Sequence, residues 1–381
     1  MAQLFATDKE IYDLIMASSR RLSANALVEL LQDRRIFIGA DGRSKLADML
    51  ATLPHDYHDV VGLVAKGEMA RRAERTTSVR IPGSISLADL RAALASYVTD
   101  VAGREEVHTQ SATAHRLMVH IEYDEVEYSR TSLIQKQRKS SDFDFHIDEN
   151  LVTVRFPASE KAREIISQVT SKLSELKRQN YIPEGITVSH ITTPAGRSDF
   201  FLKLMRSIEG FRFLTVTDVR VGRFSEGGGV DALDGEEATD QSIGGRSEQL
   251  ISYIQSVSMR GENLVMTQEF QRLMAGGFFV TALTWDADRI GEPRDLMRFD
   301  VSFEEGVAGT GLRYALRHKT RRDNGNLVAT FHPVPDIHRP GLFGAIESAA
   351  RRVLLEMEAQ RAPRSESDRA ERDPADAEAR P

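Results

Sequence analysis

Residues 142–179 read DFDFHIDENLVTVRFPASEKAREIISQVTSKLSELKRQ, and this stretch decides the fold class. Apolar and polar residues alternate in 142–147 and again in 151–156, which predicts two strands with one buried face each. The intervening Asp-Glu-Asn is typical of a tight turn, so the two strands are expected to form an antiparallel hairpin. A long amphipathic helix should follow, because its apolar residues are spaced by three and four: Ala162, Ile165, Ile166, Val169 and Leu173.

The rest of the chain alternates between strands and helices without a regular βαβ order. Besides this hairpin, strands are predicted at 78–81, 115–123, 186–193, 278–287, 296–305, 311–320 and 326–333, with a strand pair at 211–224. Helices are predicted near 8–17, 25–33, 44–50, 55–64, 86–98, 199–208, 268–277 and 344–360. The sequence therefore predicts an α+β fold in which an N-terminal helical module precedes mixed, largely antiparallel sheets with packed helices. No internal sequence repeat is visible.

Changes in composition divide the chain into four regions. An N-terminal helical module is predicted at 1–70, an α+β domain at 76–183 and a second α+β domain at 186–358. The glycine-rich acidic segment 225–246 contains almost no core-forming residues and is predicted to be a mobile loop inside the second α+β domain. Residues 359–381, rich in charged residues, Pro and Ala, are predicted to form a disordered tail.

Composition excludes several classes of protein. The 381 residues contain no cysteine, so disulfides, thiolate metal sites and cysteine nucleophiles are excluded. No apolar run approaches the roughly 20 residues that a membrane span needs, and the N-terminus does not have the pattern of a signal peptide. We therefore expect a cytoplasmic protein without a membrane partner, and we predict no metal site and no cofactor. The net charge is −7, but the acidic segment and the tail account for it, so an anionic partner is compatible with the remainder.

Residues 36–50, IFIGADGRSKLADML, contain a glycine-rich turn before an amphipathic helix. A phosphate-binding P-loop requires Gly-Lys-Ser/Thr five residues after its first glycine. Here Gly42 comes only three residues after Gly39, Lys45 follows the serine, and Asp41 would repel a phosphate. The nucleotide-binding interpretation is therefore rejected.

The longer stretch 22–50 resembles the SAP domain, a short helix–extended–helix module that binds DNA in many proteins. The residues that carry the resemblance are Leu27, Leu30, Leu31, Gly42, Lys45, Leu46 and Leu50. The connecting segment is slightly longer than is usual in the family and contains an extra aspartate. The resemblance implies phosphate contacts by Arg34, Arg35, Arg43 and Lys45. The alternative is an ordinary helical hairpin that docks on the next domain or on a partner protein.

Two further basic runs contain no acidic residue. In 129–141 the candidate contacts with nucleic acid are Lys136, Arg138 and Lys139. In 311–322 they are Arg313, Arg317, Lys319, Arg321 and Arg322, with Tyr314 and His318 between them. Guanidinium groups can hold phosphates while aromatic rings stack on bases. Solvent-exposed strand faces and a hairpin tip are the alternative interpretation of both runs.

The best candidates for catalysis are two carboxylates and a lysine. Asp300 and Glu304 are four residues apart on a predicted strand and so lie on one face, and Lys319 belongs to the next strand. Such a set could hold Mg²⁺ and activate water, as in a metal-dependent nuclease. Exposed acids on a sheet are common, so no catalytic residue is assigned beyond these weak candidates.

Together the patterns favour a non-catalytic accessory protein of a bacterial-type cytosolic assembly that binds nucleic acid, with DNA preferred. The alternative is a subunit that uses its helices and apolar strands to bind a larger enzyme, so a protein partner or self-association is also expected. A metal-dependent nuclease is the third hypothesis. The three basic regions favour the first hypothesis if they converge on one surface.

Overall fold

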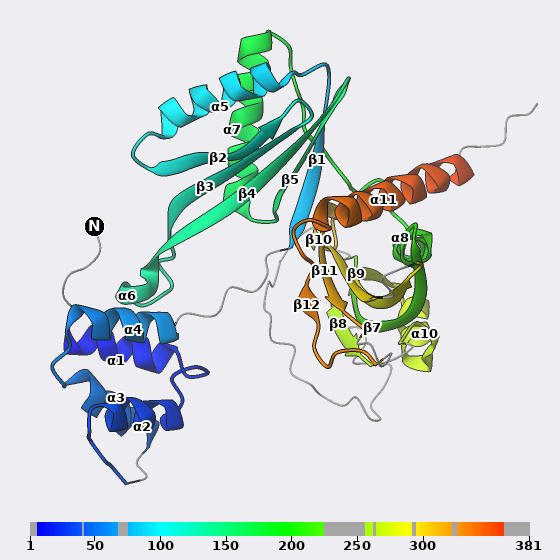
Figure 1. The fold of residues 1–381 in the computed structure, drawn as a ribbon. Coiled ribbons are helices and arrows are strands. Elements are labelled where there is room, and N and C mark those ends of the chain that lie inside the picture. Colours follow the sequence, from blue (N-terminus) through cyan, green and yellow to red (C-terminus); the bar gives the residue numbers. More distant parts are fainter. Residues whose placement is uncertain are drawn as a thin grey trace, which may run out of the picture. The chain divides into compact units, whose positions relative to one another are not determined.

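The protein has an α+β fold, here described from a computed structural model (Figure 1). The structure describes residues 6–39, 42–67, 75–224, 256–261, 264–291, 295–321 and 326–361. It contains two compact units. The first unit comprises residues 1–74 and 81–182, and the second comprises residues 75–80 and 183–381. We describe each unit separately.

The N-terminal part of the first unit is a helical module. Its helices are α1 (Asp8–Ala17), α2 (Ala24–Asp33), α3 (Arg43–Ala51) and α4 (Tyr57–Gly67). Leu14, Leu27 and Leu46 lie in its core, because the apolar spacing of each helix directs one stripe inward. The short helix α6 (Ser132–Gln135) packs on this module through Ile134, and the Ser132 hydroxyl donates a hydrogen bond of 2.9 Å to Glu10.

The remainder of the first unit is an antiparallel sheet covered on one face by two helices. The strands are β2 (Glu105–Thr113), β3 (Arg116–Val126), β4 (Lys136–Asp148) and β5 (Leu151–Pro157), and each pairs with the next. The helices α5 (Leu87–Val101) and α7 (Glu160–Lys177) pack against each other. Alternate residues of β4, such as Phe143 and Phe145, are buried, as the sequence pattern predicted.

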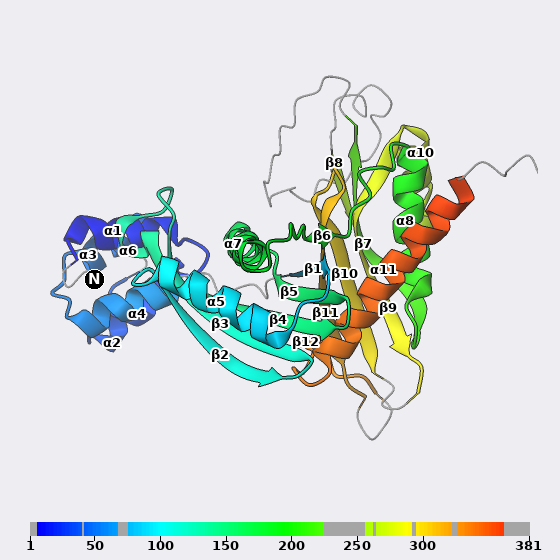
Figure 2. The same ribbon diagram turned by 90° about the horizontal axis from the view of Figure 1, so that it is seen from above.

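The second unit contains another antiparallel sheet with helices on one face. Its elements are β1 (Thr76–Pro82), β6 (Glu184–Gly185), α8 (Pro194–Ser207), β7 (Phe211–Arg223), β8 (Ser256–Arg260), η1 (Leu264–Met266), α10 (Gln268–Ala275), β9 (Phe278–Arg289), β10 (Leu296–Glu305), β11 (Thr310–Lys319), β12 (His332–Pro333) and α11 (Arg339–Arg361). The strand order is β1-β11-β10-β9-β7-β8. Figure 2 shows α11 crossing α8, and both helices contribute to the core that also contains Trp285 and Phe299.

The same order of elements occurs in both units. Each contains a helix, four antiparallel strands that pair in sequence, and a closing helix. In the first unit these are α5, β2 to β5 and α7, and in the second they are α8, β7, β9, β10, β11 and α11. The element β8 and the segment with η1 and α10 lie between β7 and β9. The chain therefore repeats one topology without a recognisable repeat in sequence.

Several local predictions differ from the structure. The predicted strand at 186–193 forms no strand, although Ile186, Val188 and Ile191 are buried, because its backbone bonds mainly to the turn and strand near Gly309. The predicted strand pair at 211–224 is the single strand β7, whose register shifts at bulges. The strand predicted at 326–333 is reduced to β12.

Three of the regions predicted from the sequence can be compared with the structure. The strand expected to open the 76–183 domain is β1, whose residues up to Arg80 belong to the second unit and pair with β11 through Thr76 and Thr77. Helix α11 continues to Arg361, so the first residues of the predicted tail at 359–381 are helical. The predicted mobile loop at 225–246 and residues 362–381 lie outside the described residues.

Candidate nucleic-acid interface

The sheet of the second unit has one apolar and one polar face. Along β10, Phe299 and Val301 point into the core, so Arg298 and Asp300 lie on the opposite face. The helices α8, α10 and α11 bury their apolar side chains on the core side. We call the opposite side the polar face. Its cations are Arg75, Arg212, Arg220, Arg260, Arg298, Arg313, Arg317, Lys319 and Arg321. Its carboxylates are Asp218, Asp286, Asp288, Asp300 and Glu304. Among the described residues, cations therefore outnumber carboxylates on this face.

Bidentate ion pairs fix the centre of the polar face. Arg298 donates two hydrogen bonds of 2.7 and 2.9 Å to the carboxylate of Asp286, its neighbour on β9. Asp286 is only 8% exposed, so this pair is a structural part of the sheet. Arg75 similarly lies 3.0 Å from Asp300 and donates to the Ser302 hydroxyl. Each of these two central carboxylates therefore forms an ion pair with a neighbouring arginine.

The cations at the margins of the polar face are more exposed. The side chains of Arg212 and Arg260 are 72% and 83% exposed, although each forms an ion pair, with Asp288 and Asp218 respectively. A guanidinium has five N–H donors, so donors that are not used in these pairs remain available to an anion. Arg220 and Arg317 are also exposed, and within the described part of the chain no carboxylate forms an ion pair with either.

The structure brings together most of the C-terminal basic run. Arg313, Arg317 and Lys319 occupy alternate positions of β11 and so share the polar face. Arg321 reaches the same face, where it lies 3.6 Å from Asp288. Lys319 lies over the ring of Phe331 at 4.5 Å from its centroid. Arg322 lies outside the described residues.

Sequence reasoning missed the other cations of the polar face, namely Arg75, Arg212, Arg220, Arg260 and Arg298. They are scattered over four segments, each of which contains acidic residues nearby in the sequence. The sequence pattern did indicate the orientation of Arg298. This residue lies between the apolar Met297 and Phe299 on a predicted strand, so its side chain was expected to face away from the core. Only the strand order could show that these residues lie next to β11.

The middle basic run does not form a basic surface. Carboxylates of β3 and β2 pair with each of its cations: Lys136 with Asp124, Lys139 with Glu125, and Arg138 with both Glu106 and Glu122. The hydrogen bond from Arg138 lowers the pKa of the Glu122 carboxyl, and that from Lys136 lowers the pKa of Asp124. The run contains no acidic residue in the sequence, but acidic residues of the neighbouring strands lie beside its cations in the structure.

The N-terminal cations divide into two pairs. Arg43 donates to the backbone carbonyls of Leu22 and Ile15, and so ties α3 to the end of α1 and the turn that follows it. Arg34 donates to the Pro54 carbonyl at 2.7 Å and forms an ion pair with Asp59. These two residues hold the helical module together, whereas Arg35 and Lys45 are exposed.

The three catalytic candidates are not brought together. Asp300 is opposite Ala315 on β11, whereas Lys319 is opposite Leu296 at the far end of β10. Arg75 already neutralises Asp300, and the structure gives no shared position for Asp300, Glu304 and Lys319. Among the described residues no group of three histidines or carboxylates is arranged to hold a metal ion. The nuclease hypothesis receives no support from these side chains.

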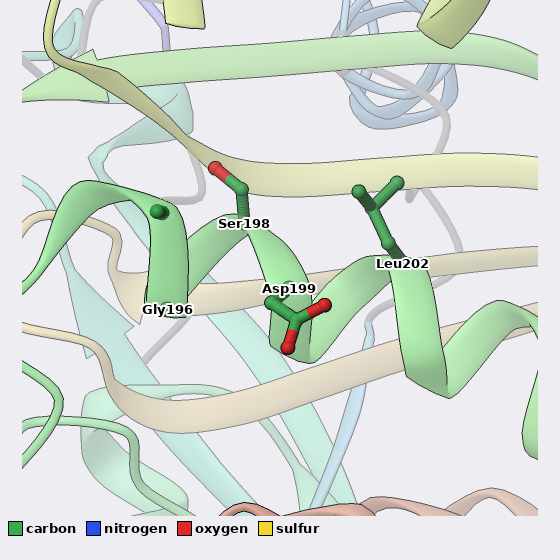
Figure 3. A pocket seen from close by; sticks show the side chains of 5 residues that line it. Gly196, Ser198, Asp199 and Leu202 are labelled. Atoms are coloured by element: carbon green, nitrogen blue, oxygen red, sulfur yellow. The ribbon is translucent and has the colours of Figure 1, made fainter.

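A shallow hollow of about 310 Å³ lies along α8 and is lined by Ala195, Gly196, Ser198, Asp199 and Leu202. Figure 3 shows the Ser198 hydroxyl directed at the neighbouring strand and Asp199 turned away from it. The Ser198 hydroxyl accepts a hydrogen bond from the Val280 amide of β9 at 3.1 Å. The hydroxyl therefore anchors α8 to the sheet, and Asp199, the carboxylate that lines the hollow, forms an ion pair with Lys203 at 2.8 Å.

Comparisons with known proteins do not identify a relative: no family model matches the sequence, and no curated protein matches it significantly. None of the helices in the described part of the chain has the length and apolar character required to cross a membrane. The polar face of the second sheet is therefore the candidate site on structural grounds alone.

Proposed function

We propose that the protein is a non-catalytic nucleic-acid-binding component of a cytoplasmic assembly, with DNA as the preferred ligand, and that it binds through the polar face of the second sheet. The excess of cations over carboxylates on this face carries the proposal. Local charge, not the net charge of −7, determines attraction at short range, because a surface charge acts over roughly 8 Å at physiological salt.

The exposed arginines suit phosphate contacts in particular. A guanidinium presents planar paired donors that match phosphate oxygens, and it keeps its charge at any physiological pH. Arg317 and Lys319 lie on one strand two residues apart, which separates them by about 7 Å along the polar face. The sequence reasoning selected both residues, and the structure adds the cations of β7, β8 and β10 around them.

Binding is best tested by fluorescence anisotropy with labelled DNA at several salt concentrations. The variant Arg317→Gln/Lys319→Gln should bind about tenfold more weakly than the native protein, and the slope of log K against log salt should fall by nearly two. The control Arg206→Gln/Arg272→Gln removes the same charge from exposed positions on α8 and α10 and should bind normally. Equal affinity of both variants, or no salt-dependent binding by the native protein, would refute the proposal.

A second candidate function is that of an interaction subunit, and one observation favours it. The segment between α2 and α3 exposes Phe37 by 77%, and Tyr57 at the start of α4 is 50% exposed. Arg34 and Arg43, two of the four cations that the resemblance to the SAP domain implies for DNA, are engaged inside the module. A stoichiometric partner that persists after nuclease treatment and is lost in Phe37→Asp would support this function, whereas retention in Phe37→Asp would exclude this surface.

A further inference from the structure

Cations of the polar face form two lines that flank a central strip. The first line, which we call the β11 line, contains the exposed Arg317 and the half-buried Arg313 and Lys319. The second, the β7–β8 line, contains Arg212 and Arg220 of β7 and Arg260 of β8. Between the two lines lie β9 and β10, whose residues on this face include the carboxylates Asp286, Asp288 and Asp300.

Strand pairing places the two lines side by side. Arg220 is opposite Ala282, Ala282 is opposite Ser302, and Ser302 is opposite Arg313, so one row joins Arg220 to Arg313. A second row joins Arg212 through Asp288 and Leu296 to Lys319. Each line therefore spans the same rows of the sheet. Arg313 and Lys319 are six residue steps apart along β11, which gives a line of about 20 Å.

The spacing between the lines follows from the sheet. Three strand-to-strand steps separate β7 from β11, and at about 4.8 Å per step the two lines are about 14 Å apart. A phosphate placed midway would lie over Asp286 and Asp300, whose charges Arg298 and Arg75 already balance, whereas a phosphate over either line would meet guanidinium or ammonium groups. The most favourable positions for phosphates therefore form two lines, with a strip of paired charges between them.

We infer that this face takes a double-stranded nucleic acid, with one backbone on each line of cations. A single strand has one line of phosphates and can occupy only one of them. The two backbones of a B-form duplex flank a major groove about 12 Å wide, which is close to the separation of the lines. This inference rests on the proposed function and specifies its ligand.

The test compares a blunt 20-base-pair duplex with one of its single strands, using the full chain and the same anisotropy assay. The variant Arg220→Gln/Arg260→Gln removes two cations from the β7–β8 line, and Arg317→Gln/Lys319→Gln removes two from the β11 line. Each should weaken duplex binding about tenfold and lower its salt slope by nearly two. The native protein should bind the duplex more tightly than the single strand. The control Arg206→Gln/Arg272→Gln should change neither affinity, and Trp285 fluorescence should confirm that all variants are folded.

The outcomes separate this inference from the proposed function. Duplex binding that depends on the β11 line but not on the β7–β8 line would overturn the two-line inference and leave nucleic-acid binding standing. Single-strand binding as tight as duplex binding would have the same consequence. Absence of salt-dependent binding to either probe would overturn both. Normal duplex affinity after restoring charge with Arg220→Lys/Arg260→Lys would support the phosphate contacts proposed for the β7–β8 line.

Discussion

Arg197 is a buried cation that forms no ion pair with a carboxylate in the described part of the chain. The residue is 4% exposed and donates to three backbone carbonyls: Ile191 at 2.7 Å, Val307 at 2.7 Å and Ala308 at 3.0 Å. Burial lowers the pKa of its guanidinium below the ordinary value for arginine. The side chain thereby fixes the start of α8 to the turn between β10 and β11, so we expect its replacement to destabilise the second unit.

The size of the effect follows from the three bonds. A hydrogen bond from a charged donor contributes about 1.5–3 kcal/mol, and a buried carbonyl left without a partner costs about 1–3 kcal/mol. Arg197→Met keeps most of the apolar stem but removes every donor, and it also removes the cost of burying the charge. After this offset, we expect the free energy of unfolding to fall by about 3–5 kcal/mol.

Urea denaturation of the full chain can measure this loss. The only tryptophan in the sequence, Trp285, is fully buried and stacks on Phe299 with ring centroids 5.3 Å apart, so its emission reports on the core of the second unit. The control Arg206→Met changes an exposed arginine of the same helix and should alter stability by less than about 0.5 kcal/mol. A loss below about 1 kcal/mol in Arg197→Met would refute the structural role assigned to the guanidinium.

Three further predictions concern local packing and charge. Gly309→Ala should cost about 3 kcal/mol by the same urea assay, because φ is +75° and a Cβ would lie 2.4 Å from Arg197 Nη1; an unchanged midpoint would contradict this. Arg43→Gln should lower the protection of α1 and α3 amides from hydrogen exchange about tenfold or more, whereas unchanged protection would show that its carbonyl contacts are dispensable. Burial alone would raise the pKa of Asp144, but hydrogen bonds from His146 and Arg116 lower it to about 2. Its folded pKa is thus below the unfolded value of 3.8, so it stabilises the protein above about pH 4 and the contribution of about 2 kcal/mol disappears as the pH falls to about 2. The difference in unfolding free energy between the native protein and Asp144→Asn, measured by urea denaturation, should shrink over that pH range. A difference that stays constant would disprove the stabilising role of the Asp144 carboxylate.

Elements with a strong periodic pattern could be predicted from the sequence. The hairpin of β4 and β5 and the helix α7 are where their alternation and spacing placed them, because each buries one face against the core. Residues 186–193 are equally apolar and also buried, yet they form no strand. The burial of these residues could be predicted from their apolar character. Strand formation could not, because it depends on which strands pair, and the local sequence does not show this.

The candidate site was predictable only in part for a similar reason. Alternation in β11 placed Arg313, Arg317 and Lys319 on one face, and the structure confirms that arrangement. Whether such a face is basic depends on its neighbours, which lie far away in the sequence. Lys136 and Arg138 have the same alternate spacing on β4, but the acids of β2 and β3 neutralise them.

The repeated topology allows the two sheets to be compared, although β4 is the third of the four strands in its unit and β11 is the fourth. In the first unit, β4 carries the cations, and the adjacent strand β3 supplies Asp124, which is opposite Arg138 and pairs with Lys136, and Glu122, which pairs with Arg138. In the second unit, β11 carries the cations, and its neighbour β10 presents Arg298 opposite Arg317. Two sheets built by the same order of elements therefore have faces of different electrostatic character. Because the backbone arrangement is shared, the difference comes from the side chains of neighbouring strands, and the anion-binding function we propose is a property of the second sheet as a whole and not of its basic run alone.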